Sequence, residues 1–169
     1  MQNLSAKYGK TLNLDKLTSY CPGCGHGIVT RLVAEAIETL GIRERAIAIV
    51  GIGCGGFSHH YMDVDAIEAT HGRSPSFAVG YKLCRPDNIV FTYCGDGDSC
   101  AIGLGDLMHA ANKGMPITSI MVNNSVFGMT GGQMAPTTLL GMKTATTPYG
   151  RDPRLNGYPY KIAEMMAHL

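Results

Sequence analysis

The sequence IVFTYCGDGD, residues 89–98, decides the fold of this chain. Its first half is a short apolar run, which predicts a buried strand, and its second half is a polar loop rich in glycine. Apolar residues then recur at helical spacing over residues 104–111, and residues 117–122 form a further apolar strand that ends at Asn123-Asn124. Strand, helix and strand in this order predict a right-handed crossover between two parallel strands.

The same alternation occurs earlier in the chain. Residues 28–40 carry apolar side chains at helical spacing, and residues 46–50 (AIAIV) form a strand that ends in the glycine loop GIGCGG. A helical turn is possible near residues 64–69, and a helix begins at residue 160. We expect the following segments to be otherwise irregular: 1–20, 57–76, 82–85 and 128–159. The prediction is a single α/β domain over residues 1–169, with a parallel sheet, helices on both faces, and ligands at the carboxyl ends of the strands.

The composition indicates a compact domain that is partly covered by a partner. The 169 residues are 45% hydrophobic and only 16% charged, with a net charge of +1, which leaves little polar surface for a free-standing monomer. The charges form no basic stripe, so we expect no nucleic-acid partner. The N-terminus is polar and no apolar run is long enough to cross a membrane, so we expect no membrane association and a cytoplasmic location.

Residues suited to metal binding follow two of the predicted strands. Asp96 and Asn124 each lie just past a strand end, and Mg²⁺ binds carboxylate and neutral oxygens together with phosphates. Gly95 and Gly97 would let the backbone approach a diphosphate closely, and the N-terminus of the following helix favours an anion. Alone, residues 95–98 are more simply interpreted as a turn, and Asn123-Asn124 as a loop that ends a strand. The two segments together predict a metal and diphosphate site.

These residues resemble the signature of the thiamine diphosphate enzymes, in which GDG precedes a strand–helix–strand unit and an Asn pair. The run GDGDS…AIGLGDLMHAANKGMPITSIMVNNSVFGMTGGQMAPTT is similar to the small catalytic subunit of the 2-oxoacid:ferredoxin oxidoreductases, and the resemblance covers residues 15–165. It implies the thiamine-diphosphate-binding fold and a Mg²⁺ ion held by Asp96, Asn124 and the carbonyl of Val126. It also implies that the following residues line the cofactor: Gly53, Cys54, Gly55, His71, Gly97, Asp98, Gly128 and Met129.

The six cysteines are better read as metal, cluster or buried thiols than as disulfides. Cys21 and Cys24 form a C-x-x-C pair, and Cys54 lies among glycines; such a pair alone is ambiguous among zinc, redox and cluster roles. The resemblance implies that these three are ligands of a proximal [4Fe–4S] cluster. The family's fourth ligand lies in a C-terminal region missing from this chain, which we therefore expect to be a fragment or one piece of a split subunit. Three further thiols do not match that fourth position: Cys84, Cys94 and Cys100. Cys94 ends a strand and reads as a core thiol.

The same resemblance implies coenzyme A-dependent oxidative decarboxylation of a 2-oxoacid, with electrons passed to ferredoxin. In this family the carboxylate that activates the cofactor belongs to a partner subunit, so no residue here is assigned a catalytic role. The expected partners are the alpha subunit, gamma and delta subunits, ferredoxin, the 2-oxoacid and coenzyme A. The sequence leaves open whether the 2-oxoacid is 2-oxoglutarate, a branched-chain acid or pyruvate.

Two other classes of protein stay open at this point. One is a zinc-stapled binding module without catalytic activity, built on the C-x-x-C pair. The other is a nucleotide-binding dehydrogenase, because GIGCGG after a strand satisfies the dinucleotide fingerprint. That fingerprint needs a helix that opens at the last glycine, whereas residues 57–61 show no clean apolar period.

Overall fold

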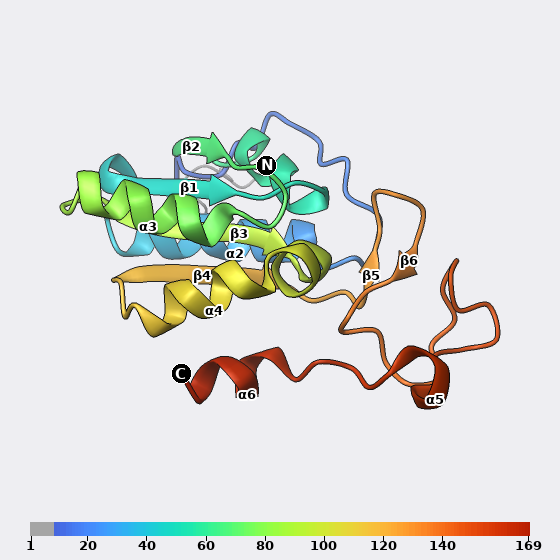
Figure 1. The fold of residues 1–169 in the computed structure, drawn as a ribbon. Coiled ribbons are helices and arrows are strands. Elements are labelled where there is room, and N and C mark those ends of the chain that lie inside the picture. Colours follow the sequence, from blue (N-terminus) through green and yellow to red (C-terminus); the bar gives the residue numbers. More distant parts are fainter. Residues whose placement is uncertain (1–8) are drawn as a thin grey trace.

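A four-stranded parallel sheet forms the centre of the molecule (Figure 1). The structure is a computed structural model that describes residues 9–169. The strands lie in the order β2-β1-β3-β4, and their bounds are β1 Ala46–Val50, β2 Asp65–Glu68, β3 Ile89–Gly95 and β4 Ile117–Val122. Val50 pairs with Tyr93, which pairs in turn with Ile120. The register therefore brings the loops that follow β1, β3 and β4 to one edge of the sheet.

Helices cover both faces of this sheet, as predicted (Figure 1). On one face, α2 (His26–Thr39) packs on Ala48 and Val50 of β1. On the other face, α3 (Ser74–Cys84) packs on Ile49 of the same strand. Successive side chains of a strand point to opposite faces, so both faces of β1 must be apolar. This explains why the central strands read as continuous apolar runs.

Short helices and a long C-terminal segment complete the domain. The short helices before β4 are η1 (Arg43–Arg45), η2 (Cys54–His60) and the π-helical turn η3 (Asp98–Ile102), and α4 (Leu104–Asn112) follows η3 directly. After β4 come β5 (Val126–Phe127), β6 (Gln133–Met134), α5 (Pro153–Asn156) and α6 (Ile162–Ala167). Figure 1 shows this segment leaving the sheet edge and returning along α4, where Ile162 packs against Leu107.

Three elements differ from the sequence-based expectation, one of them the 3₁₀ helix η2, which extends into residues 57–60 where irregular structure was expected. Residues 65–68 form strand β2 rather than a helical turn, and residues 74–84 form helix α3 where irregular structure and loop were expected. β2 is an edge strand with three of its four residues exposed, so no apolar run marks it, and its pairing with β1 holds it in place. α3 carries Pro75 in its first turn and Gly80 in its interior. Proline is tolerated at that position because its missing N–H is unused there, and burial of Ala78 and Val79 offsets the low propensity of glycine.

The strands predicted at residues 46–50 and 117–122 have those bounds in the structure, and the other predicted elements are present with shifted ends. The first helix begins two residues earlier than predicted, at His26, and the helix near residue 160 covers Ile162–Ala167. The segment 128–159 is irregular apart from the small antiparallel β5–β6 pair and α5. Within residues 9–169, no helix is long and apolar enough to span a membrane.

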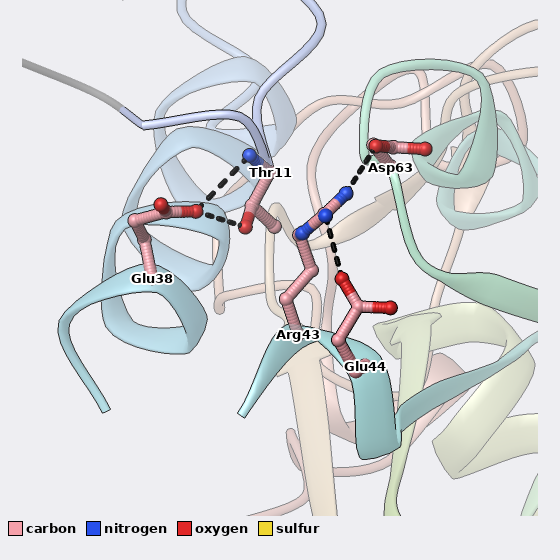
Figure 2. Close-up of polar contacts among 5 residues, drawn as sticks. All are labelled: Thr11, Glu38, Arg43, Glu44 and Asp63. Atoms are coloured by element: carbon pink, nitrogen blue, oxygen red, sulfur yellow. Dashed lines mark hydrogen bonds and ion pairs between the residues drawn. The ribbon is translucent and has the colours of Figure 1, made fainter. Parts of the chain in front are cut away.

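The N-terminal arm was predicted to be irregular; its residues 1–8 lie outside the described part, and residues 9–20 are held against the domain by polar contacts (Figure 2). Oε2 of Glu38 on α2 accepts hydrogen bonds from the backbone N–H of Thr11 at 3.2 Å and from its hydroxyl at 2.6 Å. Beside them, Arg43 donates to Asp63 at 2.5 Å and to Glu44 at 2.6 Å. The two Thr11–Glu38 hydrogen bonds fix the arm against the end of α2.

The arm then leads to the C-x-x-C loop. Its Asn13 N–H donates to the carbonyl of Tyr61 at 2.9 Å, and the backbone N–H of Ser19 donates to the Tyr61 hydroxyl at 2.9 Å. Tyr20 stacks on His26, the first residue of α2, with ring centroids 5.1 Å apart. The arm therefore delivers the cysteines that follow it to the same sheet edge as the loops after β1 and β3.

Candidate functional site

A pocket lies at the carboxyl ends of β1, β3 and β4, where a parallel sheet is expected to bind its ligand. Its lining includes most of the residues predicted from the sequence, namely Gly53, Cys54, His71, Asp96, Gly97, Asp98, Asn124, Val126, Gly128 and Met129. Gly55 is predicted to line the cofactor but is buried and is not among the lining residues; an added Cβ there would be 3.1 Å from the backbone of Cys94.

Asp96 supplies a buried carboxylate at the end of β3. Its side chain is 1% exposed, and its Oδ2 accepts a hydrogen bond from the hydroxyl of Thr137. Burial raises the pKa of Asp96, while the hydrogen bond from Thr137 acts in the opposite direction. A buried carboxylate is costly without a positive partner, so the ionised form of Asp96 would be stabilised by a cation at Oδ1.

Asn124 and Val126 meet Asp96 at this point. The end of the Asn124 amide that faces Asp96 lies 3.3 Å from Oδ1 of Asp96 and 3.0 Å from the carbonyl oxygen of Val126. With the amide nitrogen at that end, Asn124 would donate to both oxygens. With the amide oxygen there, it lies next to two further oxygens, one from a carboxylate and one from a backbone carbonyl. Ser125, which lies between the two residues, has a φ of 64°, and this tight turn directs both groups toward β3.

Gly97 permits a close approach of two loops. A Cβ at this position would lie 2.3 Å from Cε1 of Phe127, so the absence of a side chain leaves room for the Phe127 ring at the pocket wall. From the sequence, Gly97 was expected to let the backbone approach a diphosphate. In the structure the same absence is also needed for packing between the β3 and β4 loops.

Asp98 lines the pocket, but its carboxylate is engaged by another loop. Oδ1 accepts a hydrogen bond from Nδ1 of His71 and another from the backbone N–H of Gly72 at 2.7 Å. Oδ2 is buried without a hydrogen-bond partner in the described chain, and an added Cβ on Gly51 would lie 2.0 Å from it. The two predicted residues His71 and Asp98 are therefore brought together as a pair, a contact that their separation in sequence does not reveal.

The cysteines of the C-x-x-C loop lie near Cys54. The backbone N–H of Cys24 donates to the carbonyl of Cys21 at 3.2 Å, which closes the loop. Burial raises the pKa of the Cys54 thiol, and the negative charges of Cys24 and Cys21 raise it further. A positively charged metal centre among these three cysteines would stabilise the thiolate form of Cys54. Among residues 9–169, no three His, Cys, Asp or Glu side chains lie close enough together to hold a single metal ion.

The remaining cysteines lie apart from this group. Cys94 and Cys100 are each 1% exposed in the core, as expected for Cys94. Cys84 is exposed at the C-terminal end of α3, near the start of β3 and thus at the opposite edge of the sheet from the pocket.

Several residues at or near the site were missed from the sequence, including His26, Thr137 and Arg151. His26 lines the pocket, and burial lowers its pKa to about 4, so its ring is neutral at pH 7. Its position two residues after Cys24 was an available signal. Thr137 and Arg151 belong to the segment that was expected to be plain loop, and no pattern in that segment marks them.

Comparison with known proteins agrees with this geometry. Residues 43–169 match the family described as thiamine pyrophosphate enzyme, C-terminal TPP binding domain. A ketoisovalerate oxidoreductase subunit (VorA) of Methanothermobacter thermautotrophicus is 48% identical over 90% of this chain and 32% of its own length. A 2-oxoglutarate synthase subunit (KorB) of Archaeoglobus fulgidus is 40% identical over 96% of this chain and 60% of its own length.

A solved structure also matches almost the whole chain. It is the 2-oxoglutarate:ferredoxin oxidoreductase from Magnetococcus marinus with 2-oxoglutarate, coenzyme A and succinyl-CoA bound, with a TM-score of 0.87 and 34% identity over 99% of this chain and 56% of that chain. The chain thus spans about a third to three fifths of the length of these relatives. From the family match over residues 43–169, the chain belongs to the thiamine pyrophosphate enzymes, and it is similar to subunits of 2-oxoacid oxidoreductases within them.

Proposed function

We propose that this chain binds Mg²⁺–thiamine diphosphate as the cofactor-binding part of a 2-oxoacid:ferredoxin oxidoreductase. The observation that carries the proposal is that the Asn124 amide lies beside both Oδ1 of Asp96 and the carbonyl oxygen of Val126 at the sheet edge. An octahedral Mg²⁺ ion with oxygens at about 2.1 Å places neighbouring oxygens about 3 Å apart. The separations of 3.0 and 3.3 Å from the Asn124 amide fit that spacing when the amide oxygen faces inward.

The rest of the pocket suits the diphosphate. Gly128 and Met129 continue from the β4 loop beside the metal ligands, and Gly53 closes the pocket from the β1 loop. When bound, the cofactor supplies the carbanion chemistry of decarboxylation, while the protein orients it and tunes its surroundings. The residues of this chain hold the metal and the diphosphate and keep water away from the buried Asp96 carboxylate. The carboxylate that activates the cofactor is assigned to a partner subunit.

We assign Cys21, Cys24 and Cys54 to a [4Fe–4S] cluster next to the cofactor. Burial and the neighbouring Cys24 and Cys21 raise the pKa of the Cys54 thiol, and a positively charged cluster would stabilise its thiolate form. The fourth ligand is assigned to a part of the enzyme outside these 169 residues. The reaction proposed for the whole enzyme is oxidative decarboxylation of a 2-oxoacid onto coenzyme A, with electrons leaving through the cluster to ferredoxin.

The metal site is tested by Asp96→Ala in the complex purified with its partner subunits. Partners of metal ligands are themselves worth about 10–100-fold in affinity, so loss of the carboxylate ligand should weaken Mg²⁺–thiamine diphosphate by more than about 100-fold in calorimetry. Asp106→Ala is the control, because Asp106 pairs with Arg73 on the surface. If Asp96→Ala binds the cofactor like the parent, the proposal is wrong.

The cluster is tested by iron and sulfide analysis and by electron paramagnetic resonance on anaerobically prepared protein. Cys54→Ser should lower the iron content, whereas Cys84→Ser should not, because Cys84 is exposed near the opposite edge of the sheet. A stable four-iron centre in this chain alone, retained when Cys84, Cys94 and Cys100 are all changed to Ser, would contradict the assignment of the fourth ligand elsewhere. A panel of 2-oxoacids then identifies the substrate, with 3-methyl-2-oxobutanoate and 2-oxoglutarate as the first two.

A further inference from the structure

Two adjacent threonines, Thr137 and Thr138, contact the two loops that carry the proposed metal ligands. We infer that this threonine pair, fixed by Arg151, positions those ligands before any cation binds. The inference rests on the proposed metal site and assigns a role to the segment 135–158, which carries no proposed ligand of its own.

Thr137 holds the carboxylate ligand. Its side chain is 2% exposed, and its hydroxyl donates to Oδ2 of Asp96. That hydrogen bond occupies the carboxylate oxygen that faces away from Asn124 and leaves Oδ1, the oxygen nearest the amide, for a cation. Outer hydrogen bonds of this kind orient a ligating group and raise metal affinity.

Thr138 holds the turn that carries the other two ligands. Its hydroxyl donates to the carbonyl of Ser125 at 2.6 Å and accepts from the backbone N–H of Ala135 at 2.9 Å. Ser125 has a positive φ, a conformation that costs free energy in a residue other than glycine unless the surroundings hold it. The Asn124 amide and the Val126 carbonyl flank this residue, so the Thr138 contact holds both of them in place.

Arg151 holds the two threonines. Arg151 is buried, with 5% of its surface exposed. Its guanidinium donates hydrogen bonds to backbone carbonyls instead of reaching solvent. One nitrogen, Nη1, donates to the carbonyl of Thr138 at 2.6 Å and to that of Pro136 at 2.9 Å. The other, Nη2, donates to Tyr158 at 2.8 Å, and Nε donates to Gly157 at 2.9 Å. The rigid fork of arginine thereby ties the threonine pair to residues 157–158, about twenty positions later in the chain.

The test is Mn²⁺ binding in the presence of thiamine diphosphate, measured from the free Mn²⁺ electron paramagnetic resonance signal in the complex with its partner subunits. Thr137→Val removes only the hydroxyl and should weaken Mn²⁺ by about 10–100-fold, while Thr137→Ser restores the hydroxyl and most of the affinity. Thr147→Val is the matched control. Thr147 is 4% exposed in the same segment, and its hydroxyl bonds with Thr144 at 2.7 Å without touching Asp96.

Three outcomes are informative. Loss of Mn²⁺ affinity in Thr137→Val, with recovery in Thr137→Ser and no change in Thr147→Val, supports the inference. Equal affinity in Thr137→Val and the parent overturns it, provided that Asp96→Ala abolishes binding, in which case the metal site itself stands. If Asp96→Ala binds Mn²⁺ like the parent, the proposed metal site fails, and the positioning role fails with it.

Discussion

The imidazole Nδ1 of His71 donates a hydrogen bond to Oδ1 of Asp98, and this contact joins the loop after β2 to the start of η3. The same oxygen accepts from the backbone N–H of Gly72 at 2.7 Å. The other oxygen of Asp98 is buried and unpaired in the described part of the chain. One buried carboxylate therefore fixes the imidazole and the glycine turn that lie at the side of the cofactor pocket.

Asp98→Ala should destabilise the protein by about 1–3 kcal/mol, because it leaves the buried N–H of Gly72 and the His71 ring without their acceptor. The measurement is urea unfolding of the parent and the variant. Asp106→Ala is the control: it removes an ion pair with Arg73, whose side chain is 49% exposed, and such surface pairs are worth about 0–1 kcal/mol. Equal losses in the two variants would mean that the His71–Asp98 contact contributes no more than a surface pair.

Replacing Gly51 and Gly80 by alanine should change the stability of the protein in opposite directions. A Cβ on Gly51 would lie 2.0 Å from Oδ2 of Asp98 and 3.1 Å from the sulfur of Cys94, so Gly51→Ala should cost about 1–3 kcal/mol through overpacking. Gly80 lies in the interior of α3, and no described atom is within 4 Å of its added Cβ. Gly80→Ala should therefore stabilise the protein by about 0.5–1 kcal/mol, since alanine is the better helix former. Thermal unfolding of both variants measures whether the stability falls in the first and rises in the second.

The part of the site that lies at strand ends could be predicted from the sequence. Asp96 and Asn124 follow directly from two apolar strands, and parallel strands align their carboxyl ends, so the meeting of these two residues was predictable. Strand β2 could not be predicted, because an edge strand needs no apolar run when its partner strand supplies the hydrogen bonds. Helix α3 was not predicted because it contains a proline and a glycine, whose low helix propensity is outweighed by tertiary packing.

The outer part of the site was beyond a reading of sequence patterns. Thr137 reaches Asp96 across 41 positions of the chain, and Arg151 stabilises a segment that has no periodic pattern at all. Contacts of this kind depend on the path of an irregular backbone, and neither apolar spacing nor a turn signature encodes that path. The assignments of the metal, the cluster and the diphosphate to particular residues stay predictions until ligand binding is measured.

The cysteines should differ in reactivity toward a thiol reagent. Cys84 is exposed at the end of α3, whereas Cys100 is 1% exposed, and burial raises the pKa of its thiol to about 12. The thiolate is the reactive form, so at pH 8 Cys84 should be alkylated in the folded protein and Cys100 only after unfolding. Mass spectrometry of peptides after brief iodoacetamide treatment measures this, and Cys84→Ser should remove the corresponding rapid reaction. Labelling of Cys100 as rapidly as Cys84 without denaturant would contradict its buried position.

The N-terminal arm should be released by Glu38→Ala. Thr11 donates to Glu38 through both its N–H and its hydroxyl, and these bonds lower the pKa of the Glu38 carboxyl, so it is ionised and bound at neutral pH. Without the acceptor, residues 9–20 should become accessible, and limited proteolysis should cut there faster than in the parent. Glu44→Ala is the matched control, because Glu44 touches Arg43 and not the arm (Figure 2). Cleavage at the parental rate in Glu38→Ala would show that other contacts suffice to hold the arm, whereas faster cleavage in both variants would trace the effect to charge alone.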